Sequence, residues 1–214
     1  SDKGYNANEL KNDFDRWFSN KLKSTIYPQY ADIQAVEKMI CMKKKKGSAY
    51  AQLEKMIGLK EAKQVIEQAI DLYKAQKLFK DKGMKSTNIA LHMVFTGNPG
   101  TAKTTVARLF AQIMKDNGLL SVGSLIEVGR ADLVGKYVGW TAQTVKAKFE
   151  MAKGSVLFID EAYSLIDRDS GLYGDEAINT IVQEMERYRD DMVVIFAGYP
   201  EKMEYFLSRN PGLK

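Results

Sequence analysis

Apolar residues along the chain follow two alternating patterns. They make up most of four short segments, which is typical of strands buried on both faces: residues 91–96, 124–128, 156–159 and 193–197. Between these segments they recur every three or four positions, which predicts amphipathic helices. Buried strands alternating with helices indicate an α/β fold in which a parallel sheet lies between two layers of helices. Ligands of such sheets bind where the strands end.

The part of the chain before the first strand is predicted to be helical. A long helix is expected over residues 60–82, with Gly83 as its end. Two stretches with helical spacing lie in the first 47 residues, and Tyr27-Pro28 separates them because proline ends a helix and restricts the residue before it. We therefore predict a helical N-terminal appendage over residues 1–50 and a larger core over residues 51–214.

The strongest chemical signal is a glycine-rich loop between the first strand and the next helix. It consists of Gly97, Asn98, Pro99, Gly100, Thr101, Ala102, Lys103, Thr104 and Thr105. Its glycines let successive backbone N–H groups point at phosphate oxygens, and the start of the helix adds its positive dipole. The Lys103 ammonium can reach the β- and γ-phosphates, and the Thr104 hydroxyl can bind Mg²⁺. The sequence therefore predicts a phosphate-binding loop.

Ala102 departs from the usual pattern of such loops, which has glycine before the lysine. If this position requires a positive φ, alanine costs roughly 1–2 kcal/mol. Such strain would either weaken nucleotide binding about tenfold or be absorbed locally.

Two acids, Asp160 and Glu161, directly follow the third apolar run. A buried strand that ends in two acids matches the Walker B pattern, in which Asp160 holds Mg²⁺ and Glu161 takes a proton from the attacking water. Two such acids can also cap the next helix. The phosphate loop upstream favours the catalytic interpretation.

Together these motifs make the chain resemble one branch of the AAA+ ATPases. This branch contains the red-type Rubisco activase (CbbX/CfxQ) and the stage V sporulation protein K. The matching segments are residues 56–59, 96–106, 132–139, 158–165, 173–177, 196–200 and 210–212. The resemblance covers residues 56–214 and leaves the N-terminal 50 residues outside it.

The resemblance implies a P-loop NTPase fold that binds ATP and Mg²⁺ and hydrolyses the ATP. It implies that Ile57 and Gly58 contact the nucleotide base, although a simple turn before a helix stays open for them. It also implies a pore loop in a ring, usually a homo-hexamer, that contacts a protein substrate. The residues of that loop are Lys136, Tyr137, Val138 and Gly139. Tyr137 as a core aromatic remains an alternative, and Trp140 fits either loop packing or a second contact with substrate.

Several features of the family pattern are not found in this sequence. The family continues with a Ser-Arg pair that carries the arginine finger, a fifth strand and a helical lid, whereas the sequence ends at Lys214. Arg209 lies one motif too early to be the finger. We therefore expect a truncated core without its lid, slow hydrolysis by this polypeptide, and an unpaired edge on the first strand. Ala197-Gly198-Tyr199 replaces the polar sensor usual after the fourth strand.

Charge and composition narrow the partners. The net charge is +5, but residues 89–214 carry more acids than bases, so the positive excess lies nearer the N-terminus. No apolar run is long enough for a transmembrane helix, and no apolar N-terminal signal is present, so we expect a cytoplasmic protein without a membrane partner. Cys41 is the only cysteine, and His92, the only histidine, is expected to pack within the first strand.

The sequence favours an ATP-driven motor that remodels a protein substrate, in the manner of a chaperone or activase. Two other functions stay open. One is a DNA-directed ATPase, which the basic N-terminal third supports; the other is a nucleotide-dependent scaffold with little hydrolysis, which Ala102 supports. The identity of the substrate does not follow from the sequence.

Overall fold

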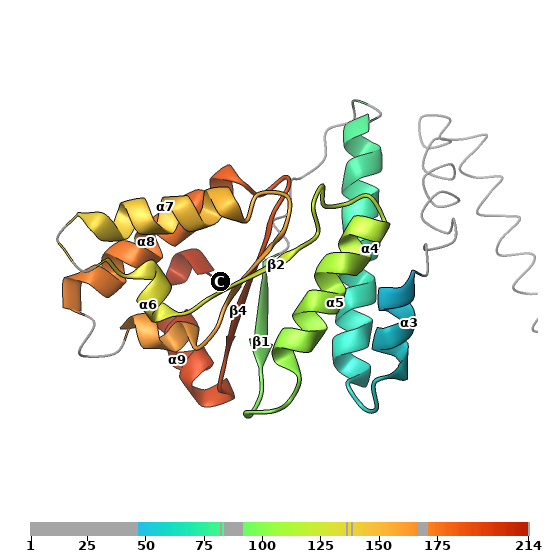
Figure 1. The fold of residues 1–214 in the computed structure, drawn as a ribbon, viewed down its shortest axis with the longest axis horizontal. Coiled ribbons are helices and arrows are strands. Elements are labelled where there is room, and N and C mark those ends of the chain that lie inside the picture. Colours follow the sequence, from blue (N-terminus) through green and yellow to red (C-terminus); the bar gives the residue numbers. More distant parts are fainter. Residues whose placement is uncertain are drawn as a thin grey trace, which may run out of the picture. The chain divides into compact units, whose positions relative to one another are not determined.

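Four parallel strands form the centre of the part of the chain that the structure describes (Figure 1). The structure, a computed structural model, describes residues 47–81, 83, 92–135, 137, 139–166 and 171–213. The strands are β1 (Met93–Thr96), β2 (Leu125–Val128), β3 (Val156–Ile159) and β4 (Val193–Gly198). Their order in the sheet is β1-β4-β3-β2, and every neighbouring pair is parallel. All four predicted strands are confirmed.

Three helices, which precede or follow β1 in the sequence, lie on one side of the sheet (Figure 1). They are α3 (Ser48–Lys55), α4 (Lys60–Asp81) and α5 (Lys103–Asp116). Apolar side chains of all three helices join one core cluster with the inward side chains of the strands. The helix predicted over residues 60–82 is confirmed as α4, and Gly83 after it has a φ of +68°, the left-handed conformation of a helix stop.

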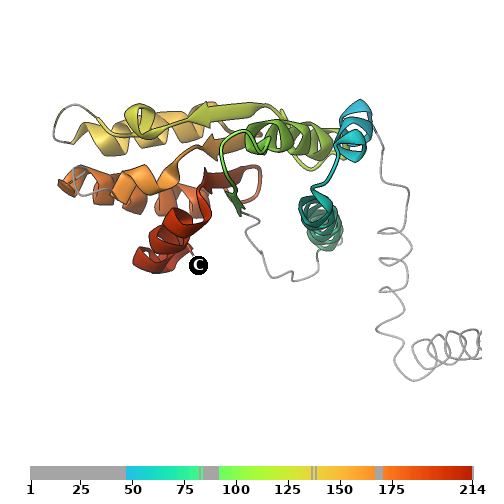
Figure 2. The same cartoon turned by 90° about the horizontal axis from the view of Figure 1, so that it is seen from below.

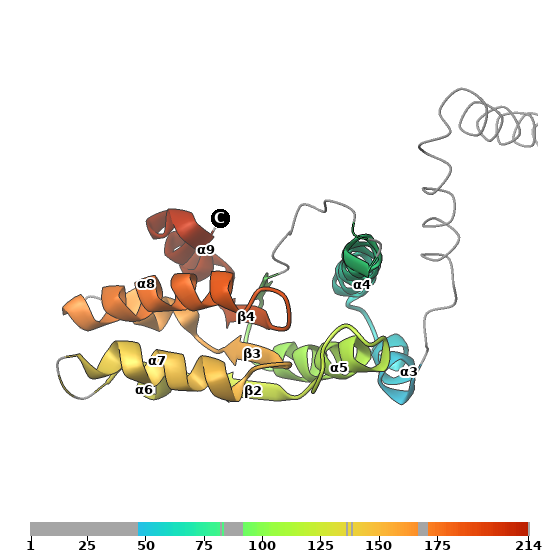
Figure 3. The ribbon, with the colours of Figure 1, turned by 90° about the horizontal axis from the view of Figure 1, so that it is seen from above.

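A second group of helices covers the opposite face of the sheet (Figure 1). It consists of α6 (Arg130–Leu133), α7 (Trp140–Met151), α8 (Gly171–Arg187) and α9 (Pro200–Arg209), with the short 3-10 helices η2 (Ala162–Ile166) and η4 (Pro211–Leu213). Helices α7 and α8 run side by side, as Figures 2 and 3 show from opposite directions. Pro200 opens α9 because its fixed φ suits the first helical position.

The central strand β3 shows why the predicted fold class is right. Its four residues are all buried, but successive side chains point to opposite faces. Val156 and Phe158 join the core on the side of α5, whereas Leu157 and Ile159 join the core on the side of α7 and α8. A strand buried on both sides must be apolar throughout, and the structure is accordingly an α/β sandwich of three layers.

The edge strand β1 differs from the prediction of a strand buried on both faces. Met93 and Phe95 pack against the α5 core, but Val94 is 38% exposed on the other face. The second group of helices covers β2, β3 and β4 and does not reach this strand. His92 precedes β1, and its Nδ1 accepts a hydrogen bond from the Val194 N–H at 3.1 Å. Burial lowers the pKa of His92 to about 4, so the ring is neutral at pH 7.

The boundary expected at residue 50 falls inside α3. Ala49 and Tyr50 are buried in the core beside α5, together with Leu53. The helices expected in the first 47 residues, as well as Cys41, lie outside the described residues. Among the described residues, no helix combines the length and apolar character needed to cross a bilayer.

Candidate functional site

The loop between β1 and α5 is anchored by its own backbone. The Gly97 N–H donates to the Gly198 carbonyl at 3.1 Å, which continues the β1–β4 pairing into the loop. The Thr101 hydroxyl then donates to the Asn98 carbonyl at 2.8 Å. Gly100 has a φ of +76°, a conformation that glycine adopts without steric cost. The chain thus curls back on itself before α5 begins at Lys103.

Ala102, the residue before the helix, is in the left-handed conformation. Its φ is +60° and its ψ is +22°. The sequence analysis expected a cost for alanine if this position required a positive φ, and the structure shows that φ is positive here. For an L-residue other than glycine this conformation costs roughly 1–2 kcal/mol.

The Lys103 side chain lies across the loop. Its ammonium donates to the carbonyl oxygens of Gly97 at 2.9 Å and Asn98 at 3.0 Å. The cation is thereby held at the first turn of α5, where backbone N–H groups have no partner within the helix. Positive charge and free donors together form a site for an anion.

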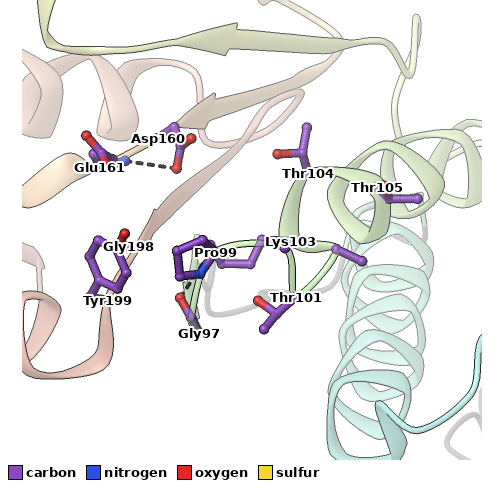
Figure 4. A pocket seen from close by; sticks show the side chains of 12 residues that line it. Gly97, Pro99, Thr101, Lys103, Thr104, Thr105, Asp160, Glu161, Gly198 and Tyr199 are labelled. Atoms are coloured by element: carbon purple, nitrogen blue, oxygen red, sulfur yellow. Dashed lines mark hydrogen bonds between the residues drawn. The ribbon is translucent and has the colours of Figure 1, made fainter.

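A cavity of about 580 Å³ opens between this loop and the ends of two strands (Figure 4). Its volume falls in the range typical of small-molecule sites. The residues that line it are Gly97, Pro99, Gly100, Thr101, Ala102, Lys103, Thr104, Thr105, Asp160, Glu161, Gly198 and Tyr199. The cavity lies where the parallel strands end, as expected for a sheet of this class.

Asp160 and Glu161 enter the cavity from the end of β3. The Asp160 N–H donates to the Val128 carbonyl at 2.9 Å, and Asp160 Oδ1 accepts from the Glu161 N–H at 3.0 Å. In Figure 4 the Asp160 carboxylate and the Thr104 hydroxyl point toward one another across the cavity. Glu161 has a φ of +49°, and such strain in a residue other than glycine is concentrated at functional sites.

Two residues at the end of β4 line the cavity and were not assigned a role from the sequence. Gly198 has no room for a side chain, because a Cβ there would lie 2.8 Å from both the Tyr163 ring and the Met203 sulfur. Tyr199 follows it, and its ring lies 5.9 Å from that of Tyr163. The signal that could have found them is their position at the end of a parallel strand next to β1 and β3.

Tyr163 connects this edge of the cavity to α9. The Lys202 ammonium lies 4.5 Å from the centre of the Tyr163 ring and 5.6 Å from that of Tyr199. Burial, followed by interaction with the Glu161 carboxylate, raises the pKa of the Tyr163 hydroxyl above its ordinary value. The hydroxyl therefore stays protonated throughout the physiological range.

Other residues singled out from the sequence lie outside the cavity lining. Ile57 is fully exposed and Gly58 has a φ of +74°, in the turn between α3 and α4. Asn98 contributes only its carbonyl to the contacts described above. Arg209 lies on α9 and donates to the Tyr205 hydroxyl at 3.1 Å.

The predicted pore loop lies between α6 and α7. Tyr137 is 62% exposed and does not pack in the core, and Gly139 has a φ of +79°. Lys136 and Val138 lie outside the described residues. Trp140, the first residue of α7, is 56% exposed.

Comparisons with known proteins agree with this arrangement. The sequence model of the ATPase family associated with various cellular activities (AAA) matches residues 93–210. The chloroplastic ribulose bisphosphate carboxylase/oxygenase activase of Cyanidioschyzon merolae is 49% identical over 159 residues, which cover 74% of this chain and 54% of the relative. Protein CbxX, chromosomal, of Cupriavidus necator is 48% identical over 168 residues, 76% of this chain and 52% of the relative.

Stage V sporulation protein K of Bacillus subtilis is 43% identical over 163 residues, 76% of this chain and 51% of the relative. The resemblance drawn from the sequence motifs is therefore confirmed. The chain spans about half the length of the curated relatives that it matches.

Proposed function

Because this chain belongs to the AAA family of ATPases, we propose that its cavity binds ATP with Mg²⁺ and that ATP hydrolysis drives the remodelling of a protein substrate. One observation carries the proposal: the phosphate loop and the acids that follow β3 line the same cavity. A lysine, a threonine hydroxyl and two carboxylates are the set of groups that phosphoryl transfer from a nucleotide requires.

We assign the phosphates to the loop of residues 97–105. Backbone N–H groups at the start of α5 donate to phosphate oxygens, and Lys103 neutralises charge on the β- and γ-phosphates. The Lys103 ammonium now donates to two carbonyls of the loop, so phosphate oxygens replace those acceptors when nucleotide binds. Ile57 and Gly58 are proposed, from the family resemblance, to contact the base.

Thr104 and Asp160 are proposed to hold Mg²⁺. The two side chains face one another, and hydroxyl and carboxylate oxygens are the ligands that Mg²⁺ prefers (Figure 4). Within the described part of the chain, no three His, Cys, Asp or Glu side chains gather into a metal site, so the remaining ligands would be phosphate oxygens and water. When bound, the ion neutralises charge on the transferred phosphoryl group.

Glu161 is proposed to act as the general base. Its carboxylate takes a proton from the attacking water, whose oxygen bonds to the γ-phosphorus while the bond to the bridging oxygen breaks and ADP leaves. In Figure 4 the Glu161 side chain points away from Lys103.

The substrate is proposed to be a protein that the pore loop contacts in a homo-hexameric ring formed by the complete protein. The exposed ring of Tyr137 supports this role, because an aromatic side chain makes apolar contacts with any extended polypeptide. The name of the Cyanidioschyzon merolae relative describes an activase of an enzyme, which also favours a protein substrate.

Two variants of the complete protein test the proposal. Glu161→Gln is expected to bind ATP normally and to hydrolyse it about 10²-fold more slowly or worse, because it removes the base. Tyr137→Ala is expected to keep ATP binding but to lose the unfolding of a fluorescent reporter protein that carries an unstructured tail. The control is Glu204→Gln, which changes an exposed acid on α9 outside the cavity lining. Wild-type hydrolysis by Glu161→Gln would exclude the assigned base.

A further inference from the structure

The segment between α6 and α7 is closed at its base. The Gly135 N–H donates to the Thr141 hydroxyl at 3.2 Å, and Thr141 is completely buried. A Cβ on Gly135 would stand 2.7 Å from the Cβ of Trp140 and 2.8 Å from the Thr141 nitrogen, so only glycine permits this close approach. Tyr137, Gly139 and Trp140, which lie between these two points, are all exposed.

Two aromatic rings on this segment contact each other instead of the core. The Tyr137 and Trp140 rings are 5.1 Å apart between centroids, at an interplanar angle of 68°, the edge-to-face arrangement that aromatic pairs favour. The backbone N–H of Trp140 also donates to the backbone carbonyl of Tyr137 at 3.2 Å. Both side chains are more than half exposed, so the pair is ordered by its own contacts and remains open to a partner.

We propose that Trp140 and Tyr137 form one contact surface for an unfolded polypeptide segment, with Trp140 touching the substrate directly. This inference rests on the proposed function, in which the same loop contacts a protein. It adds the Trp140 ring to that contact. From the sequence alone, Trp140 fitted either packing within the loop or a second contact with substrate.

The geometry and charge of the segment favour a polypeptide over a nucleic acid. Bases stack on aromatic faces along a series of cations that follow the phosphates. Here the two rings are steeply inclined to each other, so they cannot offer two parallel faces to neighbouring bases. The segment itself, residues 134–139, has one cation, Lys136, and no series of basic residues. Apolar contact between rings and an extended chain needs neither feature.

Fluorescence of Trp140 gives a direct test. These 214 residues contain two tryptophans, so Trp17→Phe, combined with phenylalanine at any tryptophan elsewhere in the complete protein, makes Trp140 the only emitter. The complete protein is assembled with a non-hydrolysable ATP analogue and titrated with reduced, carboxymethylated ribonuclease A, an unfolded chain without tryptophan. We expect the emission maximum to shift to shorter wavelength as the indole loses water, and native ribonuclease A to cause no shift.

Three results in this experiment would overturn the inference. The first is an unchanged spectrum while fluorescence anisotropy shows that a labelled unfolded chain is bound. The second is a full shift on assembly alone, which would mean that a neighbouring copy covers Trp140. The third is an equal response to an oligothymidylate, which would assign the surface to nucleic acid.

Variants separate this inference from the proposed function. Trp140→Ala is expected to weaken binding of the unfolded chain at least tenfold, and Trp140→Phe to recover most of the loss. Met151→Ala, an exposed apolar position at the other end of α7, is expected to bind normally. Loss of binding in Tyr137→Ala with normal binding in Trp140→Ala would refute the role of Trp140 but leave the pore-loop assignment intact. Normal binding in both variants would remove the pore-loop assignment as well.

Discussion

Replacing Ala102 with glycine should stabilise the protein, although the substitution removes a methyl group. Ala102 has a φ of +60° and a ψ of +22°. For alanine this left-handed conformation costs roughly 1–2 kcal/mol, whereas glycine adopts it freely. Two terms oppose the gain. Glycine loses more chain entropy on folding, about 0.4–1 kcal/mol, and a half-buried methyl contributes about 0.4 kcal/mol.

The balance is a gain of about 0.5 kcal/mol for Ala102→Gly, which raises Tm by roughly 1–2 °C in a domain of this size. Differential scanning calorimetry and urea unfolding measure it. The affinity for nucleotide should stay within about twofold. The reason is that Ala102 already adopts the left-handed conformation while Lys103 bonds to the carbonyls of the loop, so the cost arises on folding and not on binding.

Gly100→Ala provides the matched control. Gly100 lies two residues earlier in the same loop, with a φ of +76°, and a Cβ added there would meet no other atom within 4 Å, so only the backbone term acts. We expect it to destabilise the protein by about 0.8 kcal/mol, which is the cost of the left-handed conformation less the chain entropy that alanine saves on folding. A lower Tm for Ala102→Gly would refute the strain at Ala102. A tenfold gain in affinity would show instead that the loop acquires this conformation only when nucleotide binds.

Three further outcomes follow from the structure. Because burial lowers the pKa of His92 to about 4, the unfolded chain binds a proton more readily between pH 6.5 and 4; stability should fall by up to about 3 kcal/mol as the pH falls through that window, and urea unfolding of His92→Asn should lack this part of the pH dependence. Gly198→Ala should lower the free energy of unfolding by about 1–3 kcal/mol, because its Cβ would overlap the Tyr163 ring, and thermal unfolding measures the loss. Arg108→Ala should change stability by less than about 1 kcal/mol in the same assay, since its 2.6 Å ion pair with Glu127 is exposed to solvent.

Much of the fold could be predicted because it depends on local patterns. The run 156–159 is apolar at every position, and β3 is buried on both faces. The exposure of Val94 could not be predicted in the same way. The sequence of β1 resembles that of a buried strand. The exposure of Val94 depends on which helices reach the edge of the sheet, and this is a property of the whole fold.

In the candidate site, too, some residues could be predicted from local sequence and others could not. The loop of residues 97–105 is continuous in sequence, so its residues could be named from the motif alone. Gly198 and Tyr199 line the same cavity only because β4 lies between β1 and β3. The pairing of β4 with β1 joins residues about a hundred positions apart. The base contacts assigned to Ile57 and Gly58 stay predictions, because both residues lie outside the cavity lining.

Binding of Mg·ATP to the Lys103→Ala variant tests the central claim most directly, with isothermal titration calorimetry as the assay and Lys115→Ala, an exposed lysine of the same helix, as the control. A charge-assisted hydrogen bond to phosphate is worth about 1.5–3 kcal/mol, so the account predicts at least a tenfold weaker Kd for Lys103→Ala and an unchanged Kd for Lys115→Ala. An equal Kd for Lys103→Ala and the unaltered protein would contradict the assignment of this cavity to the nucleotide.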